Sequence, residues 1–244
     1  QQAEFLESAS DYETARQVAY KALALAEEQG LHHDQARIWL VVGRSWQALG
    51  HNQSALEAFE HALTVHERGS TNRGEEITVY TRLIMTYRDM GDLNRAQETA
   101  ELALEKARSQ EDSLAIAQVH NALAWIMRAR GDHRAEAEHC KAMLERMRAI
   151  GHLYYVGVGL NNLGLAHNAL GEHGPAIETT RRALDIFRQI DHRQGQVITL
   201  LNLSSRYKDT GQLALARQVL AEALPLAREL SLPDDEARIL SSLG

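Results

Sequence analysis

Glycines that recur at a nearly constant interval constrain the fold of this chain more than any other feature. They stand 41, 40, 40 and 40 residues apart, at Gly50, Gly91, Gly131, Gly171 and Gly211. Each follows a stretch with the apolar spacing of an amphipathic helix. Since glycine adopts the left-handed backbone conformation at low cost, each is predicted to end a helix.

Residues on both sides of these glycines repeat as well. Thirteen residues later there is always a leucine, and eight residues earlier a valine or leucine. Five residues later the residue is alanine in four cases, Ala55, Ala96, Ala176 and Ala216, so a second helix can pack closely on the first. Each unit is therefore a helix pair that must stack on its neighbours to bury its apolar face. Few aromatic residues, 5% of the chain, and only three prolines also favour an all-α protein.

These positions resemble the tetratricopeptide repeat, with its large residue, Leu-Gly/Ala pair, turn glycine and two alanines in the second helix. The 40-residue period is similar to the subtype found in kinesin light chains, Rap-type bacterial regulators and the sensor arrays of large bacterial regulators. The resemblance implies an all-α, right-handed superhelical solenoid of antiparallel helix pairs. We expect about 13 helices, each of about 17 residues.

The domain prediction is a single array over residues 1–244. It consists of five full repeats, here called repeats 1 to 5 in chain order, with partial repeats at 1–30 and 233–244. Ser10 takes the turn position of the first partial repeat, and Gly244 the small-residue position of the last. We expect a fragment of a longer protein, because both ends fall within a repeat. Residues 68–76 are a predicted loop, and repeat 3 should pack more loosely because Glu136 and Met143 replace alanines.

Charge and composition exclude several functions. The net charge of -7 disfavours nucleic-acid binding by counterion release. A single cysteine excludes an internal disulfide and agrees with a reducing, cytoplasmic compartment. No apolar run approaches the length of a membrane span.

Residue patterns for catalysis or metal binding are also missing. Gly159 and Gly164 have the separation of a phosphate loop, but Leu165 and Ala166 replace its Lys-Ser/Thr pair. The 12 histidines have no ligand spacing, and Cys140 falls at a position that packs between helices. We therefore expect no enzyme activity, no catalytic residue, no metal site and no cofactor.

The resemblance implies that the first helices line a concave face that binds an extended peptide or a helix. Carried over by position, the predicted groove residues are Arg37, Arg44, Arg88, Asn121, Trp125, Arg128, Asn161, Asn162, Asn168, Asn202 and Lys208. Their basic side chains favour an acidic segment, and an asparagine amide can hold any peptide backbone. Trp125 is a candidate anchor. The alternative is a set of ordinary solvated polar residues with Trp125 half-buried between helices.

The sequence thus predicts a protein- or peptide-binding scaffold or sensor module of a larger signalling or regulatory protein, which captures an extended or acidic segment. One alternative is a structural module that spaces attached domains or self-associates, with a homodimer as the expected form. Another is a regulatory domain of a multidomain enzyme that responds to a small ligand. Light scattering would test self-association, and the full-length sequence would test the third function.

Overall fold

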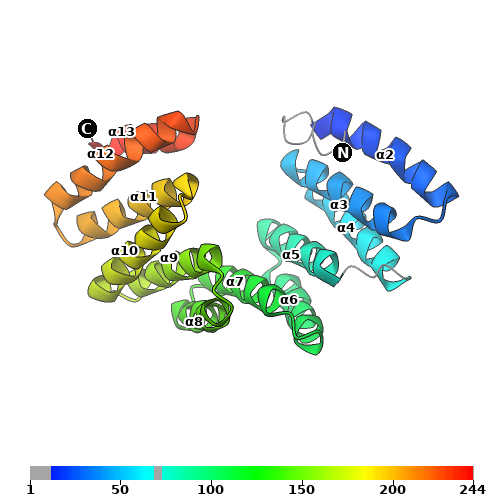
Figure 1. The fold of residues 1–244 in the computed structure, drawn as a ribbon, viewed down its shortest axis with the longest axis horizontal. Helices are drawn as coiled ribbons and strands as arrows, with labels where there is room; N and C mark the ends of the chain where they lie inside the picture. Colours follow the sequence, from blue (N-terminus) through cyan, green and yellow to red (C-terminus); the bar gives the residue numbers. More distant parts are fainter. Residues whose placement is uncertain (1–11, 69–72, 244) are drawn as a thin grey trace. The chain divides into compact units, whose positions relative to one another are not determined.

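The computed structural model describes residues 12–68 and 73–243, and it folds them into twelve helices without a β-strand among them (Figure 1). The chain divides into two compact halves, residues 1–115 and 116–244. The first half holds α2 (Tyr12–Glu28), α3 (His32–Ala48), α4 (Asn52–Glu67), α5 (Arg73–Asp89) and α6 (Leu93–Ser109). The helices α7 (Ser113–Ala129), α8 (His133–Ala149), α9 (Leu153–Ala169), α10 (His173–Gln189), α11 (Arg193–Asp209), α12 (Leu213–Glu229) and α13 (Pro233–Leu243) follow, and all but the first residues of α7 lie in the second half.

Helix lengths and turns agree with the repeat. Ten of the twelve described helices have 17 residues, the length predicted from the period. The five turn glycines have φ between +73° and +81°. At Gly171, the backbone N–H donates to the carbonyl of Asn168 at 3.0 Å and closes the last turn of α9. These findings confirm the all-α array of helix pairs.

A second left-handed turn recurs in the repeat. It lies between the second helix of one repeat and the first helix of the next, at Gly30, Glu111, Gly151, Asp191 and Ser231. Only two of these residues are glycine. Three different side chains thus take a backbone conformation that only glycine adopts without strain. For this reason the second turn leaves no glycine pattern in the sequence.

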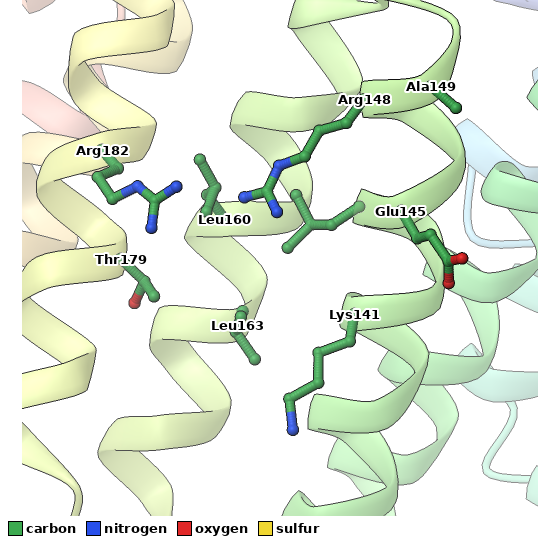
Figure 2. Close-up of a pocket in the computed structure, with 9 residues that line it drawn as sticks. Lys141, Glu145, Arg148, Ala149, Leu160, Leu163, Thr179 and Arg182 are labelled. Carbon is green, nitrogen blue, oxygen red and sulfur yellow. The ribbon is translucent and has the colours of Figure 1, made fainter.

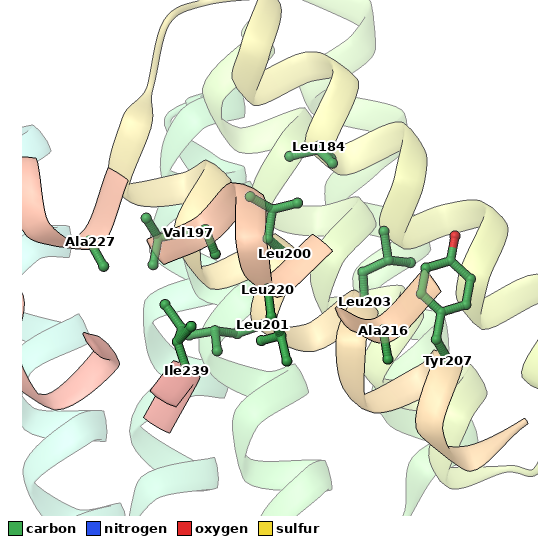
Figure 3. Close-up of a cluster of buried hydrophobic side chains, with 11 residues drawn as sticks. Leu184, Val197, Leu200, Leu201, Leu203, Tyr207, Ala216, Leu220, Ala227 and Ile239 are labelled. Atoms are coloured by element: carbon green, nitrogen blue, oxygen red, sulfur yellow. The ribbon is translucent and has the colours of Figure 1, made fainter. Parts of the chain in front are cut away.

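The small residues of the motif let the two helices of a repeat approach closely. The alanines that follow the turn, Ala55, Ala96, Ala176 and Ala216, are at most 1% exposed. A Cβ on Gly164 of α9 would lie 2.4 Å from the hydroxyl oxygen of Thr180 on α10, too close for any side chain. In the second half, Leu184 and Ile239 join residues of α11 and α12 in one apolar core (Figure 3).

The irregular parts of the sequence behave as follows. Residues 73–76 of the predicted loop belong to α5 and 69–72 lie outside the described residues, as do Ser10 and Gly244. Glu136 and Met143 are fully buried. No helix of the described residues is long and apolar enough to cross a membrane.

Candidate functional site

Four of the predicted asparagines form hydrogen-bonded pairs between neighbouring first helices. Asn162 Nδ2 on α9 donates to Asn121 Oδ1 on α7 at 2.8 Å. Asn202 Nδ2 on α11 donates to Asn161 Oδ1 on α9 at 3.0 Å. Both pairs are 41 residues apart, one more than the period, so each joins a helix to its successor with an offset of one residue. We call these four residues the asparagine row.

Each pair in the asparagine row leaves half of its hydrogen-bonding capacity unused. Asn161 and Asn162 are 8% and 6% exposed, and Asn121 and Asn202 are half-buried. Within the described part of the chain these amides make only the two bonds above, and none of their other polar atoms is closed off from solvent. A pair therefore offers one Nδ2 donor and one Oδ1 acceptor. That is the complement of a peptide group, which carries one acceptor and one donor.

The other predicted residues of this half have different surroundings. Asn168 is occupied on both sides of its amide, because Nδ2 donates to Asp209 Oδ2 at 3.0 Å and Oδ1 lies 3.3 Å from His173 Nδ1. Lys208 is exposed and donates to the carbonyl of Ser242 at 3.3 Å. Trp125 is partly exposed and lies one turn after Asn121 on α7, so both share a helix face.

The basic residues of the first half lie close to carboxylates. Arg37 Nε is 3.6 Å from Glu75 Oε1, and Arg88 Nη2 is 2.7 Å from Asp89 Oδ1. Arg44 is exposed on α3. The basic character of this face is thus weaker than the predicted residues alone suggest, since neighbouring acidic residues were not counted.

Arg128 is held by a buried carboxylate. Its Nε donates to Glu136 Oε1 at 2.7 Å, and His133 Nδ1 lies 2.9 Å from the other oxygen of Glu136. The side chain of Glu136 is 1% exposed, whereas that of Arg128 is 33% exposed. This contact joins α7 to α8 and explains how a carboxylate can replace the small residue of the motif.

Arg206 of α11 was missed by the sequence analysis. It is 2% exposed, and its Nη1 donates to the carbonyl of Asn202. Its Nε and Nη2 are enclosed and have no hydrogen-bond partner in the described part of the chain. Burial lowers the pKa of Arg206 to about 10, Asp209 opposes this shift, and the charge of Arg128 adds to it. The available signal was an arginine where the other repeats have Ser45, Thr86, Ile126 and Ala166.

The residues capable of nucleophilic or metal chemistry do not form such a site. Cys140 is 1% exposed, and burial raises the pKa of its thiol to about 12, so the thiol stays protonated at neutral pH. In residues 12–68 and 73–243, no group of three or more His, Cys, Asp or Glu side chains is placed to hold a metal ion.

A pocket of about 630 Å³ lies between α8 and α10 (Figure 2). Leu160 and Leu163 of α9 form its floor, on the side of the helix opposite Asn161. An adjoining hollow of about 390 Å³ shares Arg148, Leu160 and Arg182 with it. Nothing in the sequence analysis pointed to this pocket.

Comparisons with known proteins agree with this geometry. Residues 155–229 match the tetratricopeptide repeat family, which confirms the resemblance inferred from the sequence. No curated protein matches the chain. Among solved structures, BtubC (BKLC) from P. vanneervenii has a TM-score of 0.77 at 19% identity, with 91% of this chain and 92% of that chain covered.

Two regulatory proteins are also similar in structure. A Rap protein complexed with Competence and Sporulation Factor has a TM-score of 0.73 at 17% identity, with 86% of this chain and 57% of that chain covered. A STAND signal-transduction ATPase with a tetratricopeptide repeat sensor, from Pyrococcus horikoshii, has a TM-score of 0.75 at 15% identity, with 98% and 35% covered. At these identities the likeness shows the fold.

Proposed function

We propose that this array of tetratricopeptide repeats is a protein-interaction module that binds an extended peptide segment along α7, α9 and α11. The fold itself favours an interaction or sensor module, and no catalytic family is indicated. One observation carries the finer proposal. The two asparagine pairs each leave a donor and an acceptor accessible, at equivalent places on successive repeats.

The spacing of the pairs fits an extended chain. Packed helices lie about 8–10 Å apart, and an extended peptide advances about 3.3 Å per residue, so roughly three residues span one step of the array. A peptide group can then accept from Asn161 Nδ2 and donate to Asn202 Oδ1. The next group but two can meet Asn121 Nδ2 and Asn162 Oδ1 in the same way. Because these bonds go to the backbone, the site tolerates different side chains, and Trp125 offers an anchor for one apolar residue.

The proposal includes a preference for acidic segments. Arg37, Arg44 and Arg88 would supply it on the first half, and Lys208 on the second. Two of these arginines already face carboxylates, so we expect this preference to be modest and sensitive to salt. The Rap structure supports a sensor function, since a protein of this fold was solved with a signalling factor bound.

Alanine variants of the asparagine row test the proposed site. Peptides selected from a random library should bind Asn161→Ala and Asn202→Ala about 5–10-fold more weakly than wild type, which corresponds to one lost hydrogen bond each. Fluorescence anisotropy measures this, with Gln218→Ala, an exposed amide on α12, as the matched control. Because both asparagines also join helices, thermal unfolding must show that each variant is folded at the temperature of the assay. Unchanged affinity in both variants would refute the site.

A further inference from the structure

An ion pair joins the second helices of repeats 4 and 5. Arg188 of α10 donates to Glu222 of α12, and both side chains are partly exposed. Arg188 follows its turn glycine by 17 residues, and Glu222 follows the next turn glycine by 11. The pair therefore defines two equivalent positions, at which an arginine of one repeat meets an acidic residue of the next.

One step earlier, the same two positions hold two arginines. Arg148 of α8 and Arg182 of α10 are the equivalents of Arg188 and Glu222. Their guanidinium groups point toward one another across the pocket, above Leu160 (Figure 2). A carboxylate that joins the two repeats in one step is thus replaced by a second cation in the other, and two like charges face each other.

No carboxylate of the described residues takes the place of the missing one. Arg148 makes no ion pair there, and the closest acidic contact of Arg182 is Glu178 at 3.9 Å, with a side chain 73% exposed. Glu145 lines the pocket, but its carboxylate points away from both guanidinium groups (Figure 2). Lys141 adds a third cation at the other end, although it already bonds Glu138.

The floor of the pocket is apolar. Leu144, Leu160 and Leu163 lie beneath the arginines and are themselves packed against the core. A small inorganic anion would satisfy the guanidinium groups and leave these leucines uncovered. A protein segment can do both, because it can present a carboxylate beside apolar side chains.

We propose that this pocket binds an acidic side chain of a partner protein, whose carboxylate bridges Arg148 and Arg182 in the way that Glu222 pairs with Arg188. Planar guanidinium forks match a carboxylate well, and two of them bind it from opposite sides. Apolar residues of the same segment cover Leu160 and Leu163. The pocket and the asparagine row lie on opposite sides of α9, so this docking site is independent of the proposed peptide site.

A designed peptide tests the pocket. The probe is a fluorescein-labelled helical peptide of about four turns, with one glutamate between two leucines on one face. It should bind wild type about tenfold more tightly than the same peptide with glutamine for glutamate. Arg182→Glu should lose a similar factor, because it rebuilds the Arg188–Glu222 arrangement inside the chain.

Two controls make the result specific. Arg146→Glu changes the net charge equally, lies outside the pocket on α8, and should bind the peptide like wild type apart from a small salt-sensitive change. Asn161→Ala should leave this binding unchanged. Equal binding of the glutamate and glutamine peptides would overturn the proposal, and so would an equal loss in Arg146→Glu. Inorganic phosphate that binds at the same arginines while the peptide does not would also overturn it.

Discussion

Replacement of Arg206 by methionine should increase the free energy of unfolding by about 1–4 kcal/mol. The guanidinium is 2% exposed, and two of its nitrogens lack a partner among the described residues. An enclosed charge without hydrogen bonds costs more than it returns, whereas methionine fills most of the same volume. Ile126 and Ala166 at the equivalent positions show that the packing accepts an apolar side chain there.

The effect should depend on pH in a defined direction. The folded chain releases the proton of Arg206 at a pKa of about 10, below the ordinary value of 12.5 in the unfolded chain. The charge therefore destabilises the folded chain at neutral pH, and this cost is lost as the pH rises through 10. The gain of Arg206→Met over wild type should shrink above pH 10. Denaturant unfolding measures it, with Arg217→Met, an exposed change on α12, as control; a loss of stability in Arg206→Met at pH 7 would contradict the prediction.

Replacement of Arg128 by methionine should have the opposite effect and cost about 2–4 kcal/mol. The change leaves the carboxylate of Glu136 with His133 as its hydrogen-bond partner in the described part of the chain, and that carboxylate is almost fully enclosed. Glu136→Ala should cost about 1 kcal/mol or less, because Arg128 reaches solvent and alanine is the residue of the other repeats. Removal of one partner is therefore far more harmful than removal of the other.

The double variant Arg128→Met/Glu136→Ala provides the control for this asymmetry. It should be more stable than Arg128→Met alone, since no buried charge remains. Unfolding in guanidinium chloride, followed by circular dichroism, gives the four stabilities of the cycle. Equal losses in the two single variants would show that the buried position of Glu136 does not govern the pair.

The fold follows closely from the sequence because its determinants are local. A glycine thirteen residues before a leucine, and an alanine between them, mark a helix end and a close contact wherever they occur. This local code identified the helix lengths and the turns after the first helices. It did not identify the turns after the second helices, where Glu111, Asp191 and Ser231 adopt the glycine conformation because the two helices leave no alternative.

The site was only partly predictable, since its bonds cross between repeats. The asparagines were recognised by position, but their pairing depends on an offset of one residue between successive helices. The acidic partners of Arg37 and Arg128 come from other helices, and the sequence gives no distance to them. The enclosed Arg206 and the facing pair Arg148 and Arg182 become visible only when equivalent positions are compared on the folded chain.

Backbone N-methylation of a bound peptide tests the central claim most directly, namely that the asparagine row reads the peptide backbone. Each selected peptide would be scanned by N-methylation of one residue at a time, which removes a single N–H donor, and its affinity for wild type measured by anisotropy. We expect two sensitive positions about three residues apart, each with a loss of roughly tenfold. The loss at one of them should disappear in Asn202→Ala, whose Oδ1 acceptor is gone. A scan without sensitive positions, or one whose losses are the same in Asn202→Ala, would contradict the claim.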